Sequence, residues 1–189
     1  NALLTAMAER ELHIPRVGRI AAAPTFRVVA AMNPYDTVGT GRISVSIYDR
    51  LCRLALGYQS ADEEAAIVRV RSGSGDEPLV QAAVALTRST RQHPDLRLGA
   101  SVRGAIDLVL VANQLRAIRA GKERTDLVAL VLDAGLLALS ARITVAETSE
   151  RTAEATSREL WETLFVLGPG GGSGEHRLEI DPNSAAVTR

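Results

Sequence analysis

Cysteine is almost absent from this sequence, since Cys52 is the only one in 189 residues. A single cysteine excludes an intrachain disulfide and is compatible with a reducing compartment, so we expect a cytoplasmic protein. Long apolar runs are absent too, because none approaches the roughly 18 residues that a membrane-spanning helix needs. The opening residues, NALLTAMAER, lack the basic start and apolar middle of a secretory signal. We therefore expect a soluble protein without a membrane partner.

The sequence has no net charge, because 22 basic residues balance 22 acidic ones. No overall attraction therefore draws the chain toward nucleic acid or anionic lipid. A helical DNA-binding regulator is one possible function for the second half of the chain, but it predicts a basic helix face. The balanced charge of residues 60–142 speaks against it, and we expect no nucleic-acid partner.

Residues with the spacing of a metal site or a phosphate-binding loop are also missing. His13, His93 and His176 are scattered and Cys52 has no second cysteine nearby, so we assign no metal site. The sequence contains no GxxxxGK loop followed by Ser or Thr, and no Asp-Glu pair at a strand end. Without backbone amides to hold phosphates and a carboxylate to hold magnesium, the chain alone has no basis for tight nucleotide binding.

The first part of the sequence alternates helical and strand patterns. Residues 1–9 have helical spacing, and residues 12–14 with a second extended stretch near Ile20 predict a hairpin. The apolar run FRVVAA over residues 26–31 is typical of a central strand in a parallel sheet. Turn residues fill 32–41, and a short helix over 43–50 and a strand over 53–56 follow. The α/β part ends near Gly57.

The second part is predicted to be helical. Ser60 and Glu63 form a capping box, and helices follow over 60–71, 77–90, 101–120 and from Thr125 or Asp126 to 142. Short loops between four helices predict a compact bundle. A weaker amphipathic helix over 149–165 contains Trp161, and the glycines after it predict a flexible tail. The expected domains are therefore residues 1–59, 60–147, 148–166 and 167–189.

Several segments resemble, in the same order, the MoxR branch of AAA+ ATPases. The run FRVVAAMNPYDTVGTGR is similar to the family's "ATMNP" or "ATQNP" strand end and its glycine-containing loop. IYDRL and LGY are similar to "LDRF" and "GYP", and NALLTAMAEREL to "ALLEAMEERQV". LGASVRGAIDLV is similar to the "GASPRA" segment that starts a lid helix. The combination covers most of the first 150 residues and is far more specific than any one piece.

The resemblance implies the C-terminal part of a P-loop AAA+ α/β core, with parallel strands and a β-hairpin, followed by an all-α four-helix lid. The family implies an ATP-driven remodelling motor that forms a homo-oligomeric ring, commonly a hexamer. Its partner is a client protein, often one with a von Willebrand A domain. The chain begins at Asn1 inside a helical pattern, so we expect the natural protein to extend upstream. ATP and Mg²⁺ are then the cofactors of the intact protein.

Asn33 matches the family's first sensor, at the end of the predicted central strand. There it would hydrogen-bond the γ-phosphate or the attacking water, a task for a neutral polar group because negative charge near phosphate is unfavourable. The alternative from spacing alone is that an Asn before Pro caps a turn.

Arg50, in YDRL, matches the arginine finger that reaches a neighbouring subunit's phosphates, with Asp49 orienting it. The alternative is an ordinary exposed salt bridge. Arg103, in ASVRG, matches the second sensor, which contacts phosphates of its own subunit and couples them to a hinge over residues 57–62. Glu9 and Arg10 align with a Glu-Arg pair of the family, and a helix-end ion pair is the expected explanation.

The sequence departs from the family pattern close to these residues. The departures are Val45, Tyr48, Leu51, Gln59 and Val102. Three of these surround Arg50, and they support an alternative function as a non-catalytic ring subunit or protein-interaction module that keeps the AAA+ scaffold for assembly only.

Overall fold

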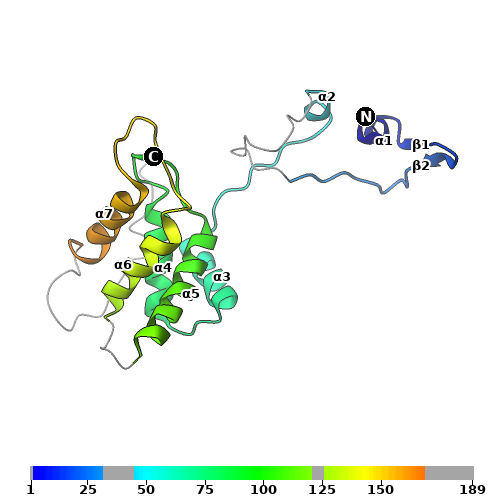
Figure 1. Ribbon diagram of the computed structural model, residues 1–189. Coiled ribbons are helices and arrows are strands. Elements are labelled where there is room, and N and C mark those ends of the chain that lie inside the picture. The colour runs from blue at the N-terminus through cyan, green and yellow to red at the C-terminus, as the bar shows by residue number, and fades with distance from the viewer. Residues whose placement is uncertain (1, 32–44, 121–125, 169–189) are drawn as a thin grey trace. The chain divides into compact units, whose positions relative to one another are not determined.

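The chain forms two compact units, divided between Leu56 and Gly57 (Figure 1). The structure, a computed structural model, describes residues 2–31, 45–120 and 126–168. The first unit contains the short elements α1, β1, β2 and α2, and the second contains all the longer helices.

A helix followed by a hairpin opens the first unit, as the sequence predicts. Helix α1 (Ala2–Ala8) leads into β1 (Glu11–Ile14), which pairs antiparallel with β2 (Gly18–Ala21). Gly18 at the start of β2 has φ +95°, a conformation that side chains with a Cβ rarely adopt. Helix α2 (Val45–Tyr48) lies within the helix expected over residues 43–50.

Residues 26–31 and 53–56 form no strand in the structure, although their apolar patterns predict one each. Val29 is 94% exposed and Leu54 82% exposed, so these side chains have no covering layer. A parallel strand is held by hydrogen bonds to neighbouring strands, and the described residues supply none here. The parallel sheet therefore stays an expectation from sequence.

The described part of the second unit is a helical bundle. Its helices are α3 (Ala61–Ser72), α4 (Glu77–Ser89), α5 (Val102–Arg119), α6 (Leu127–Leu139) and α7 (Ala153–Phe165). Helix α5 packs against α3, α4 and α6, and α7 packs against α6 and α4 (Figure 1). The largest fully buried apolar side chains of the core are Val68, Leu79, Val80, Val84, Leu86, Leu108, Val109, Leu130, Val131 and Leu139.

Polar side chains begin most of these helices at the expected residues. Ser60 and Glu63 form the predicted capping box of α3, and Asp126 accepts a hydrogen bond from the Ala129 amide at the start of α6. Helix α7 begins later than predicted, because Thr152 caps it by accepting from the Ala155 amide. Ser101 precedes α5 as expected, but its side chain makes no capping hydrogen bond.

Helix α7 contributes to the core of the bundle. Leu160 and Phe165 are buried in that core, and the indole Nε1 of Trp161 donates to the Val128 carbonyl oxygen at 2.9 Å. A two-stranded antiparallel pair, β3 (Leu96–Leu98) with β4 (Thr144–Val145), closes one end. The sequence did not predict this pair, because such short strands leave no alternating pattern to read.

Two glycines allow close packing within the bundle. A Cβ built on Gly104 would lie 2.8 Å from Leu139 Cδ2, and one on Gly135 would lie 2.9 Å from Leu86 Cδ2. Helices α4, α5 and α6 are therefore in contact at distances that a larger side chain does not permit. Within the described residues, no helix combines the length and the apolar character required to cross a bilayer.

Leu86→Ala tests whether this core stabilises the bundle. Leu86 is 1% exposed, and deleting a buried leucine side chain costs about 2–5 kcal/mol. Leu137→Ala is the matched control, because Leu137 is 65% exposed and exposed substitutions stay within about 0.5 kcal/mol. Urea unfolding followed by far-UV circular dichroism measures both, and equal losses would contradict the described core.

The capping box predicts a specific pH dependence. Hydrogen bonds from the Ser60 backbone amide and hydroxyl lower the pKa of the Glu63 carboxyl below its ordinary value of 4.5. Because the folded-state pKa is lowered, the stabilisation is complete above 4.5 and is lost as the pH falls through the folded-state value. Glu63→Gln should remove this part of the acid destabilisation, measured as the change in Tm between about pH 6 and pH 3. Glu154→Gln, at a first-turn carboxylate of α7, is the control.

Candidate functional site

The structure describes two of the three predicted site residues. Arg50 lies in the first unit, just after α2, and Arg103 lies in the second, in the first turn of α5. Asn33 lies outside the described residues.

Arg50 is exposed and its described hydrogen bond is local. Its Nη1 donates to the carbonyl oxygen of Ser46 in α2 at 2.8 Å. Arg50 forms no ion pair with Asp49 or with any other described carboxylate. The expected Asp49 contact is therefore not seen, and neither is a surface salt bridge to the described part of the chain. The guanidinium charge has no described anionic partner.

Three arginines line one cavity in the first unit. The cavity has a volume of about 470 Å³, and Arg10, Arg27 and Arg50 are among its lining residues. Arg10 donates from Nη2 to the carbonyl oxygens of Ala23 and Pro24, and Arg27 donates from Nη1 to that of Pro24. Arg10 thus ties the hairpin to the chain that follows it, instead of forming the ion pair expected with Glu9. The described lining of the cavity thus contains three positively charged side chains and no carboxylate.

Arg103 is exposed in the first turn of α5, and its side chain forms no hydrogen bond or ion pair with any described residue. Helix α5 begins at Val102, and the side chain of Ser101 before it makes no capping hydrogen bond to the first-turn N–H groups. The Gly104 amide reaches only the Ser101 carbonyl, at 2.8 Å. A helix end with open N–H groups carries partial positive charge. Arg103 adds a full charge at the same place, so this end of the bundle favours an anion.

The segment before α5 is fixed on the end of α4 through Gly99 and Ala100. A Cβ on Gly99 would lie 2.6 Å from Arg91 Cα and 2.8 Å from the Thr90 carbonyl carbon, so only glycine permits this approach. The Ala100 amide donates to Thr90 Oγ1 at 2.9 Å, and the Ala100 carbonyl oxygen accepts from Arg91 Nε at 2.7 Å. Gly99 and Ala100 therefore set where α5, and with it Arg103, begins.

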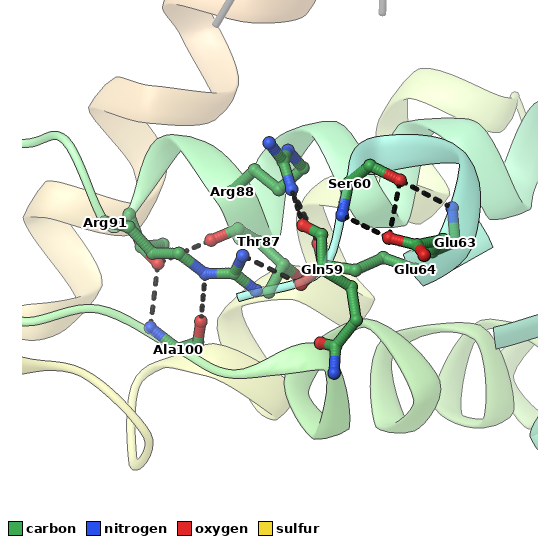
Figure 2. A network of polar contacts seen from close by, with 9 residues as sticks. Gln59, Ser60, Glu63, Glu64, Thr87, Arg88, Arg91 and Ala100 are labelled. Atoms are coloured by element: carbon green, nitrogen blue, oxygen red, sulfur yellow. Dashed lines mark hydrogen bonds and ion pairs between the residues drawn. The ribbon is translucent and has the colours of Figure 1, made fainter. Parts of the chain in front are cut away.

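A buried polar network continues from Arg91 to α3 (Figure 2). Its centre is Glu64, which is 1% exposed. Arg91 Nη1 lies 2.8 Å from Glu64 Oε1 in an ion pair that is not aligned as a hydrogen bond. Arg88 Nη1 donates to Glu64 Oε2 at 3.2 Å and to the Gln59 carbonyl oxygen at 2.9 Å. We call Glu64, Arg88 and Arg91 the carboxylate network.

The network also holds the segment through which the chain enters the bundle. The Arg91 guanidinium carbon lies 3.9 Å from the centre of the Tyr58 ring, and Arg88 binds the next residue, Gln59. Part of the predicted hinge over residues 57–62 is thus attached to α4. Sequence reasoning missed the network because its members are far apart in the chain. Arg88 and Arg91, three residues apart beside an otherwise apolar helix face, were the available signal.

The described residues offer no metal centre, since no three His, Cys, Asp or Glu side chains among them gather closely enough to hold an ion.

Comparison with known proteins finds a relative that is similar over part of this chain. An uncharacterized protein of Bacillus subtilis strain 168, named YeaC, is 29% identical over 139 residues, an alignment that covers 59% of this chain and 43% of the relative. The matched region is thus less than half the length of that curated relative. No family model matches the chain. No solved structure matches it either.

Gly99→Ala tests the close approach that places α5. The new Cβ would overlap backbone atoms of Arg91 and Thr90, which cannot rotate away, so we expect a loss of about 1–3 kcal/mol. Gly75→Ala is the matched control, because a Cβ there meets no atom within 4 Å. Thermal unfolding measures stability, and amide hydrogen exchange at residues 99–104 locates the change. A Gly99→Ala protein as stable as the control would contradict the described packing.

Proposed function

We propose that this chain supplies the phosphate-contacting residues of an ATP-hydrolysing, ring-forming AAA+ remodelling ATPase of the MoxR type. The observation that carries the proposal is the state of Arg103, an exposed guanidinium without a described partner at the open N-terminus of α5. The proposal assigns a phosphate-binding loop and a magnesium-holding carboxylate to residues outside this chain, because the sequence contains neither.

Arg103 would contact phosphates of its own subunit as the second sensor. Phosphate suits this place because the helix end and the guanidinium attract the same charge. The fixed position of Gly99 and Ala100 supports the assignment, since a contact residue must be held where its ligand binds. A planar guanidinium also binds two phosphate oxygens at once, which an ammonium group does not.

Arg50 would act as the finger toward a neighbouring subunit in a homo-oligomeric ring. Two features support this role: the side chain is exposed, and it shares a cavity with two other arginines rather than with a described carboxylate. A permanent positive charge at a transferred phosphoryl group neutralises the negative charge that develops there. Asn33, the proposed first sensor, rests on the resemblance of its surrounding motif, because it lies outside the described residues.

The ATP and Mg²⁺ of the intact protein would bind mainly through residues outside this chain. The residues present fit only the phosphate end of the nucleotide, through Arg103 and the first turn of α5. Bound Mg²⁺ would supply charge neutralisation of the phosphates during hydrolysis. A non-catalytic ring subunit or interaction module remains the second candidate, favoured by the missing phosphate loop and by the departures at Val45, Tyr48 and Leu51 around Arg50.

Arg103→Ala tests the second-sensor role in the natural protein that contains this chain together with its upstream residues. Losing charge-assisted hydrogen bonds worth about 1.5–3 kcal/mol should weaken Mg-ATP binding roughly tenfold to a hundredfold. Isothermal titration calorimetry measures this affinity. Arg97→Ala removes another exposed arginine near α5 and should leave binding unchanged. If both variants bind ATP as the unaltered protein does, Arg103 is not a phosphate contact.

Arg50→Ala tests the finger. Hydrolysis should fall on the order of a thousandfold, whereas Arg53→Ala, at another exposed arginine three residues along the chain, should leave it unchanged. Mixing Arg50→Ala subunits with subunits that lack a working phosphate loop should restore part of the steady-state rate. This happens only if each site forms between two subunits. A protein that binds Mg-ATP without hydrolysing it, whether or not Arg50 is present, would instead be the non-catalytic candidate.

A further inference from the structure

We infer that Arg91 is a positioning residue that couples the segment entering the helical bundle to the start of α5. The two segments are residues 57–60 and residues 99–103, and one guanidinium contacts both. The coupling itself is a property of the described contacts. The further statement, that phosphate binding at Arg103 acts on the entering segment through Arg91, rests on the proposed function.

Arg91 contacts three separate groups: Ala100 before α5, Glu64 in α3 and Tyr58 before α3. Its Nε donates to the Ala100 carbonyl oxygen at 2.7 Å, its Nη1 lies 2.8 Å from Glu64 Oε1, and its face covers the Tyr58 ring at 3.9 Å. The side chain is only 10% exposed, so these contacts fix its position. A guanidinium can make edge and face contacts together because it is planar, and lysine cannot replace it in this geometry.

The charges of the carboxylate network make the two segments depend on each other. Glu64 supplies one negative charge between two arginine charges, so one positive charge is left over in a largely buried place. Three neutral groups contact the two guanidinium groups and offset part of this charge: the carbonyl oxygens of Gln59 and Ala100 and the face of the Tyr58 ring. When one of these groups moves away, the arginine charge loses part of its compensation. Its contacts with the other groups then change, because burying an uncompensated charge is unfavourable.

Two buried nitrogen atoms of the network, Arg88 Nε and Arg91 Nη2, have no hydrogen-bond partner in the described structure. A buried ion pair with incomplete hydrogen bonding stabilises a fold little compared with apolar side chains of similar volume. The specific contribution of this network is therefore geometric. It holds Tyr58, Gln59 and Ala100 together, so a displacement of the segment that precedes α5, at Ala100, changes the contacts that hold the entering segment.

The coupling predicts that a substitution of Tyr58 changes amide exchange some forty residues along the chain. Tyr58→Leu removes the ring beneath Arg91 and should speed amide exchange at residues 100–104 by roughly twofold to fivefold, the value of a partly exposed cation–π contact. In an Arg91→Lys background the same Tyr58→Leu change should add nothing further, since the connecting side chain is already altered. Hydrogen-exchange mass spectrometry of the full chain measures all four proteins.

Leu56→Ala is the control at the same end of the chain, because Leu56 is 86% exposed and lies outside the network. Exchange in α6 serves as an internal reference, so that a general loss of stability is recognised as such. The inference is overturned if Tyr58→Leu leaves exchange at residues 100–104 unchanged. It is also overturned if Tyr58→Leu has the same effect in the Arg91→Lys background as in the unaltered protein.

A second measurement separates this inference from the proposed function. In the natural protein with its upstream residues, a non-hydrolysable ATP analogue should slow exchange at residues 57–60, and Arg91→Lys should abolish this slowing while the analogue still binds. If the analogue does not bind the unaltered protein, the proposed function is wrong, but the hydrogen-exchange comparison of the four proteins still tests the inference. If it binds and Arg91→Lys leaves the slowing intact, the inference fails alone.

Discussion

The buried carboxylate of Glu64 is the constraint on which the entry side of the helical bundle depends. A carboxylate that is 1% exposed needs cations beside it, and Arg88 of α4 and Arg91 just beyond its end provide them. Once these two arginines are held by Glu64, their remaining donors reach Gln59 and Ala100. The first turn of α3 thereby fixes both the way the chain enters the bundle and the place where α5 starts.

Local signals in the sequence predicted most of this bundle. Ser60 with Glu63, and Asp126 before an apolar run, mark helix starts because a side-chain oxygen and a backbone amide a few residues apart form the cap without outside help. The hairpin of β1 and β2 was predicted for the same reason, since its pairing joins residues close in sequence. Helix α7 was also found, but its packing through Leu160 and Phe165 depends on distant partners.

Features that depend on residues far apart in the chain were predicted less well from the sequence. The run over residues 26–31 has the composition of a buried strand, yet a strand forms only where neighbours accept its hydrogen bonds. Glu64 reads as an ordinary acidic residue in a first helical turn, and nothing local shows that it pairs with Arg88 at the end of the next helix and with Arg91 just after it. Arg50 and Arg103 were singled out by resemblance. Both side chains are exposed, and their roles in contacting phosphate stay a proposal, as does the nucleotide.

The close packing at Gly104 and Gly135 has a mechanical consequence. Leucine methyl groups fill the space beside both glycines, so α5 cannot slide or tilt against its neighbours without compressing side chains. Helix α5 has 18 residues, which makes it a stiff rod about 27 Å long. A displacement of one end of such a helix produces nearly the same displacement at the other end. A displacement of the first turn of α5 would therefore move the packed helices together instead of deforming α5 alone.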